Sequence, residues 1–224
     1  MEAININDFN NHKIGEGEVI KRILGGEKEL YEILVRRNNQ KLYRIIRSYI
    51  KEEAEIEDIM QESYIKAFTK LYQFKLASNF STWLIRIGIN ESLARLKTKG
   101  RLVHVNEELD ALKSNAILKI PDSSQLNPQD KMIRNEAKQL LENAIDGLDK
   151  KYKAVYIMKE VEEMSLKEIS TALDLTVANV KVRLHRSKEM LKEKLYEIAN
   201  DKSIFEFGFS RCDRITENVM KLIN

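Results

Sequence analysis

Cysteine, proline and glycine are all scarce in this 224-residue chain, which has one cysteine, two prolines and eight glycines. A single cysteine excludes an internal disulfide and a cysteine-based zinc site, and the three histidines lie too far apart for a metal-ligand spacing. We therefore expect no metal and no cofactor. With few helix breakers and abundant leucine, isoleucine, lysine and glutamate, the composition is typical of an all-helical protein.

Other missing patterns narrow the function. No apolar run approaches the roughly 18 residues of a membrane span, and the N-terminus carries no signal peptide, so we expect a cytoplasmic protein without membrane insertion. A phosphate-binding loop, a dinucleotide fingerprint and a nucleophile elbow are all missing, which predicts that the chain is not an enzyme. The formal net charge is only +3, so affinity for nucleic acid must come from local patches.

Helical periodicity divides the chain into two all-helical domains with a flexible linker between them. Residues 1–102 form the first domain, in which Ile59, Ile65, Phe68 and Leu71 are expected to line the buried side of one helix. Residues 103–131 contain both prolines and lose the periodicity, which predicts the linker. Residues 132–197 form the second domain. Residues 198–224 are a C-terminal extension that contains three phenylalanines.

The stretch from Ser165 to Leu195 predicts a helix-turn-helix. Ser165 and Glu168 have the spacing of a capping box. Asp174 falls where the chain must turn sharply and tolerates a left-handed backbone, and Thr176 can cap the second helix. Between Thr176 and Leu195 there are six Lys or Arg residues against two Glu. A helix that is buried on one side and basic on the other suits the DNA major groove; the alternative is a solvated helix at the edge of a bundle.

An acidic segment in the first domain forms a second candidate binding surface. Residues 52–62 carry six acids and no Lys or Arg, and Asp58, Gln61 and Glu62 fall on one helical face together with Ile65. This face is either a solvated acidic surface or a docking face for a basic helical partner.

A short loop followed by a basic helix predicts a third surface. The loop from Leu76 to Phe80 precedes a helix whose end carries Arg95 and Lys97 within a basic run. An aromatic residue combined with phosphate-binding side chains suits single-stranded or melted DNA. The alternative is that Phe80 and Trp83 are core residues, which we favour for Trp83.

On these motifs the chain resembles the extracytoplasmic-function (ECF) sigma factors of bacterial RNA polymerase. The segments that resemble the family's first domain are Arg36–Ile50, Ala54–Phe68 and Asn79–Lys97. Residues Ala144–Leu173 and the helix that follows resemble its second domain. The order and spacing of four separate motifs make this resemblance far more specific than a lone helix-turn-helix.

The resemblance implies a role for each candidate surface. Asp58, Gln61 and Glu62 would contact the clamp helices of the large polymerase subunit, and the loop would capture a flipped base of the minus-ten element. The residues assigned to minus-ten DNA are Leu76, Ala77, Ser78, Asn79, Phe80, Arg95 and Lys97. Those assigned to the minus-thirty-five element are Thr176, Asn179, Lys181, Val182, Arg183, His185 and Arg186. The family commonly has Gly where Asp174 stands and Pro where Asp149 stands.

The implied function is that of a sigma factor, which directs core RNA polymerase to particular promoters and initiates transcription. Core polymerase, promoter DNA and an anti-sigma factor are the candidate partners. Two alternatives stay open: a helix-turn-helix regulator that acts without core polymerase, and an interaction protein such as an inactive sigma-like binder of a regulator. The extension either packs on the second domain or docks on a surface that polymerase or DNA needs.

Overall fold

The computed structural model describes residues 15–75, 78–103, 128–199, 214 and 220, and none of these residues forms a β-strand. The all-helical prediction is confirmed. The α-helices are α1 (Glu16–Leu24), α2 (Tyr31–Arg47), α3 (Glu53–Thr69), α4 (Phe80–Val103), α5 (Pro128–Asp146), α6 (Lys150–Tyr156), α7 (Leu166–Leu173) and α8 (Val177–Ala199). Three short turns complete the order: η2 (Lys28–Leu30), η3 (Leu71–Gln73) and η4 (Ile157–Val161), of which η4 has π-helical geometry.

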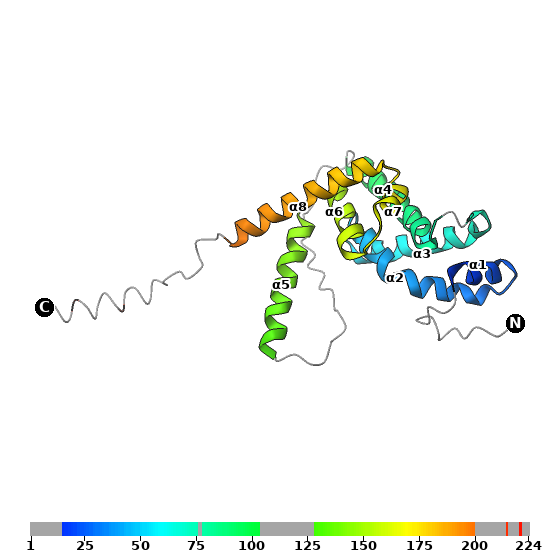
Figure 1. Cartoon of the computed structure of the whole chain (residues 1–224), viewed down its shortest axis with the longest axis horizontal. Coiled ribbons are helices and arrows are strands. Elements are labelled where there is room, and N and C mark those ends of the chain that lie inside the picture. The colour runs from blue at the N-terminus through cyan, green and yellow to red at the C-terminus, as the bar shows by residue number, and fades with distance from the viewer. Residues whose placement is uncertain (1–14, 76–77, 104–127, 200–213, 215–219, 221–224) are drawn as a thin grey trace.

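Helices α1 to α4 form the first half of the structure (Figure 1). Helix α1 ends at a pair of glycines, and Gly26 takes a left-handed backbone with φ 113°. Helices α2 and α4 approach closely at Gly88, where an added Cβ would lie 2.8 Å from the Leu42 Cδ1 atom. A glycine therefore sets the spacing between these two helices.

The buried side of α3 differs from the predicted one. Its buried residues are Ile56, Ile59, Ser63, Tyr64 and Ala67, whereas Ile65 and Phe68 are 66% and 37% exposed. The buried hydroxyl of Ser63 donates a 2.6 Å hydrogen bond to the Ile59 carbonyl oxygen. Because its hydroxyl is hydrogen-bonded in this way, Ser63 can occupy a core position. The buried face of α3 is therefore rotated about the helix axis from the face that the spacing of the hydrophobic residues alone indicates.

Helices α5 to α8 form the second half. Helix α5 begins at Pro128, inside the segment predicted to be linker, and proline suits the first position of a helix because its missing N–H has no helical partner there. Helices α5 and α8 extend away from the packed body of the molecule (Figure 1). Most of the predicted linker and most of the C-terminal extension lie outside the described residues.

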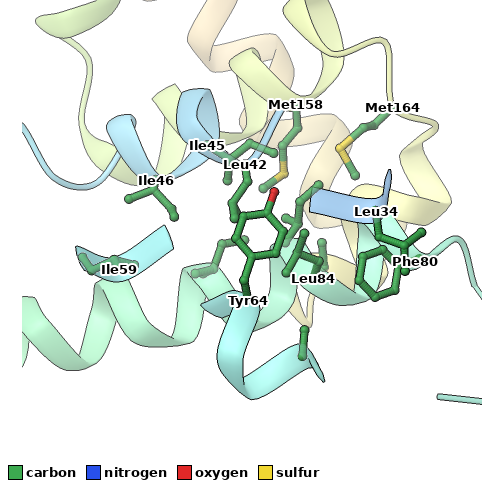
Figure 2. Close-up of a cluster of buried hydrophobic side chains, with 14 of the residues drawn as sticks. Leu34, Leu42, Ile45, Ile46, Ile59, Tyr64, Phe80, Leu84, Met158 and Met164 are labelled. Carbon is green, nitrogen blue, oxygen red and sulfur yellow. The ribbon is translucent and has the colours of Figure 1, made fainter. Parts of the chain in front are cut away.

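The two halves share one apolar core. Met158 and Met164 of the second half are buried in the same cluster as Leu34, Leu42 and Phe80 of the first (Figure 2). Helix α7 packs along α4, and η4 packs on α2. The two domains are therefore docked against each other in this structure, an arrangement that the sequence analysis does not predict.

Candidate nucleic-acid and polymerase-binding surfaces

The predicted helix-turn-helix is present with the expected local bonds. The Ser165 Oγ atom accepts a hydrogen bond from the Glu168 backbone N–H at 3.2 Å, and the Glu168 carboxylate accepts one from the Ser165 backbone N–H at 2.8 Å. Asp174 ends α7 in the left-handed region with φ 55° and ψ 47°. The Thr176 hydroxyl oxygen accepts from the Asn179 N–H at 3.2 Å. The capping box, the turn and the second cap are all confirmed.

Helix α8 has a buried face and an exposed face, as predicted. Val180, Ser187 and Leu191 are buried. Four candidate DNA-binding residues lie exposed to solvent: Lys181, Val182, His185 and Arg186. These four side chains form what we call the α8 basic face, because three of them are cationic or can become so.

The other three residues assigned to the upstream element also bond within the protein, as do His185 with Glu189 and Arg186 with the Tyr152 hydroxyl, and two of the three, Thr176 and Asn179, are exposed as well. Thr176 uses its hydroxyl as a cap, and the Asn179 side-chain oxygen accepts a 3.0 Å hydrogen bond from the Arg183 Nε–H. Arg183 is half-buried and lies near Tyr49 of the first half. Burial raises the pKa of Tyr49 to about 12, against the charge of Arg183, which lowers it. Arg183 therefore faces the first domain in this structure.

The acidic face of α3 is exposed as a unit. Asp58, Gln61 and Glu62 are all exposed, and the exposed Ile65 follows them on the same face. The Glu62 carboxylate pairs with the Arg95 guanidinium of α4 at 3.1 Å. Glu62 is predicted to contact polymerase and Arg95 to contact minus-ten DNA, yet the fold pairs their side chains, so each partly neutralises the charge of the other. Within the described part of the chain, Asp58 has no ion-pair partner, so it is a stronger candidate than Glu62 for contact with a basic partner.

The structure describes only part of the loop that is assigned to minus-ten DNA. Leu76 and Ala77 lie outside the described residues. Ser78 is half-buried, and Asn79 is exposed and donates a 2.8 Å hydrogen bond from its amide nitrogen to the Glu168 carboxylate. Further along α4, Lys97 is exposed.

Phe80 is a core residue, so its assignment to DNA contact is corrected. Its side chain is fully buried and packs edge-to-face against Phe74 and at a tilt against Trp83, each with a ring-centroid distance of 6.0 Å. An aromatic ring enclosed in this way has no face left for a base. Trp83 packs against the same core.

Sequence reasoning missed the side chains that join the two halves. Arg44 of α2 bonds Glu162, and Arg47 of α2 bonds Asp146 of α5. The partners are 118 and 99 residues apart in the chain, so no local spacing could indicate them.

The described residues contain no cluster of His, Cys, Asp and Glu side chains that could hold a metal ion. Among the same residues, no helix is both long and apolar enough to cross a bilayer.

Comparison with protein families matches both halves of the chain. The family model for sigma-70 region 2 matches residues 34–102, and the model for sigma-70 region 4 matches residues 138–191. The ECF RNA polymerase sigma factor SigW of Bacillus subtilis (strain 168) is 28% identical over 179 residues, which cover 80% of this chain and 96% of SigW. The ECF sigma-E factor of Haemophilus influenzae is 28% identical over 180 residues, 79% of this chain and 93% of its own length.

Solved structures show the same fold. The sigma factor RpoE of Bartonella quintana, crystallised with the anti-sigma factor NepR, is similar with a TM-score of 0.59 at 22% identity, over 72% of this chain and 94% of that chain. CnrH, in complex with the cytosolic domain of CnrY, has a TM-score of 0.54 at 21% identity, over 80% of this chain and 96% of that chain.

A chain that carries both regions in this order belongs to the sigma-70 family. Its relatives place it within the ECF group of that family, and it is a sigma factor that directs core RNA polymerase to promoters. A regulator with only a helix-turn-helix would account for the second match but would leave region 2 unexplained.

Proposed function

We propose that each of the three exposed surfaces binds a different partner during promoter recognition by the polymerase. The acidic face of α3 binds core polymerase, the loop before α4 binds the minus-ten element, and the α8 basic face binds the minus-thirty-five element. The observation that carries this proposal is the segregation of charge: one helix of the chain exposes carboxylates and another exposes cations, and each is buried on its opposite side. Opposite charges on separate elements fit one protein partner and one DNA partner.

The most direct test is transcription in vitro from a genomic library with core polymerase and the full chain. Sequencing the starts would give two shared boxes upstream of each, near minus ten and minus thirty-five. Starts without shared boxes, or no starts above those made by core polymerase alone, would contradict the proposal. The chain makes no phosphodiester bond itself in this scheme. It acts in the cytoplasm, where polymerase and the chromosome are found.

We expect two classes of effect from substitutions on the α8 basic face. Lys181→Ala or His185→Ala should change preference at single positions of the upstream element, at about 1–3 kcal/mol per lost base contact. Arg186→Ala should weaken binding to all sequences alike and reduce the slope of log affinity against log salt by about one. The measurement is holoenzyme binding to a set of promoter duplexes at several salt concentrations.

Lys192 is the matched control for these variants, because it is an exposed lysine of the same helix outside the α8 basic face. Lys192→Ala should leave both sequence preference and salt slope nearly unchanged. If all the variants shift affinity equally on every duplex, the division of α8 into base-contacting and phosphate-contacting residues is wrong.

We expect the loop to determine minus-ten preference. Exchanging residues 76–79 for the loop of another ECF sigma factor, with the buried Phe80 retained, should change the favoured minus-ten sequence and leave upstream binding intact. Permanganate footprints on the original promoter should weaken, because fewer thymines become unpaired. Footprints as strong as those of the unaltered protein would contradict the assignment of this loop.

An anti-sigma factor is a further proposed partner. The relative from Bartonella quintana was crystallised with one, and this chain has the same two-domain fold. Co-purification of the chain with a binding protein that blocks transcription in vitro would support this proposal.

A further inference from the structure

A cavity of about 310 Å³ lies where α6 meets the ends of three helices of the first half. Its walls come from the end of α2 and the turn that follows, from the start of α3, from the end of α4 and from the start of α6. Its volume is at the lower end of the range for small-molecule sites. None of the residues that line it belongs to the three surfaces of the proposed function.

Basic residues outnumber acidic ones in the lining of this cavity. The five cationic residues are Arg47, Lys51, Lys99, Lys150 and Lys153. The two carboxylates of the lining, those of Glu52 and Glu55, both pair with Lys99, at 3.6 and 2.7 Å from its Nζ atom. The hydrogen bond with Glu55 raises the pKa of Lys99. The charge of Lys99 is therefore balanced within the protein, and four cations remain.

Two of these four cations share a single carboxylate, that of Asp146. The terminal nitrogens of the Arg47 guanidinium donate to the two Asp146 oxygens at 3.2 and 2.8 Å. The Lys153 Nζ atom lies 3.0 Å from the Asp146 Oδ1 atom, and its side chain is only 5% exposed. Because one carboxylate carries one negative charge, it balances only one of these two cations.

Lys51 and Lys150 add to the excess of positive charge. Both are exposed, and within the residues that the structure describes neither forms an ion pair. Burial lowers the pKa of Lys153, and the charges of Lys51 and Arg47 also lower it, against the hydrogen bond and the charge of Asp146. The cations of the lining therefore lie close enough to repel one another.

One donor of the lining has no acceptor. The Nε–H of Arg47 is buried and, among the described residues, makes no hydrogen bond. Buried N–H groups without an acceptor are rare in folded proteins because they are unfavourable. An anionic oxygen in the cavity would accept from this group and would also offset the repulsion between the cations.

The lining suits a phosphate group better than a carboxylate. A phosphate monoester carries between one and two negative charges at pH 7 and has three strong acceptor oxygens, which match the unbalanced lysines together with the Arg47 donor. Tyr49, Ile50 and Leu96 supply apolar atoms to the same lining. Pockets that combine an apolar wall with a few convergent polar groups are typical of small-molecule sites.

We propose that this cavity binds a small phosphate-bearing molecule, whose phosphate oxygens are held by Arg47, Lys51, Lys150 and Lys153. The proposal is independent of the roles assigned to the three surfaces, because it uses none of their residues. A ligand held there contacts α2 and α6 together, so its binding stabilises the folded protein in proportion to its concentration.

A double variant tests the site without removing an ion pair of the fold. Lys51→Gln combined with Lys150→Gln removes the two exposed cations of the lining that have no carboxylate partner. Lys70→Gln combined with Lys167→Gln is the matched control. It removes two exposed lysines outside the lining, at the end of α3 and in α7, and leaves the same net charge.

The measurement is isothermal titration calorimetry of the full chain with ATP and, separately, with inorganic pyrophosphate, at fixed ionic strength. The parent and the control should bind with the same dissociation constant. The variant that lacks Lys51 and Lys150 should bind roughly tenfold more weakly or worse, because hydrogen bonds to charged groups are lost. The midpoint of thermal unfolding should rise with ligand in the parent and the control, and less in this variant.

The two ligands also separate the sources of affinity. Tighter binding of ATP than of pyrophosphate would mean that the apolar wall contacts the organic part, whereas equal binding would mean that the phosphates suffice, and either result supports the site. No binding to the parent, or equal dissociation constants for the two double variants, would overturn it. If only a single-stranded oligonucleotide binds and depends on Lys51 and Lys150, the cavity belongs to a nucleic-acid surface and the small-molecule site is refuted.

Discussion

Replacing Phe80 with alanine is expected to lower the free energy of unfolding by about 3–5 kcal/mol, the usual cost of deleting a buried aromatic ring. The ring is fully enclosed between Phe74 and Trp83, next to the apolar core that both domains share. Chemical denaturation of the full chain, followed by circular dichroism, measures the change.

The neighbouring Asn79 provides the control for this prediction. Its side chain is exposed and donates a hydrogen bond to Glu168, so Asn79→Ala should lower stability by only about 0.5–1.5 kcal/mol while it alters the response to minus-ten sequence. The opposite pattern, with Phe80→Ala stable but unable to open promoters, would return Phe80 to the DNA-contacting residues.

Reversing the charge of Asp58 is expected to weaken binding to core polymerase by about 2–4 kcal/mol, or roughly 30- to 1,000-fold, because like charges brought together at an interface cost several kcal/mol. Asp58→Lys is the cleaner variant, since Glu62 is paired with Arg95 and its reversal would also disturb the α3–α4 contact. Binding to core polymerase can be measured by competition against a labelled sigma factor.

Glu57 is the matched control for Asp58. It precedes Asp58 on α3, is exposed and has the same sign of charge, but points about 100° away around the helix. Glu57→Lys should bind nearly as well as the parent. Equal losses for both variants would mean that core polymerase responds to net charge alone, and an unaffected Asp58→Lys would remove α3 from the docking surface.

The helix-turn-helix could be predicted in detail because its determinants are local. The capping box spans Ser165 to Glu168, and the turn depends on the backbone tolerance of Asp174 alone. Such short-range bonds need no knowledge of the rest of the fold. The exposure of the basic side of α8 also followed from sequence, since period 3.6 assigns opposite faces once one is apolar.

The sequence-based predictions were wrong where packing between distant segments determines which side chains are buried. Phe80 lies next to a polar loop in sequence, but the rings that enclose it come from both sides of that loop. The face of α3 was misplaced because Ser63 is buried with its hydroxyl satisfied. The docked domains depend on pairs such as Arg44–Glu162, whose members are joined only by the tertiary fold.

Helix α4 also fixes a length within the first domain. It is a continuous helix of 24 residues, about 36 Å long at 1.5 Å per residue, with the minus-ten loop at its start and the segment that leads to the second domain at its end. That length is close to one helical turn of B-DNA, about 34–36 Å. If the loop binds minus-ten DNA as proposed, the rigid α4 helix would keep the bound nucleotide about one DNA turn from the point where the chain leaves the first domain, however the second domain moves.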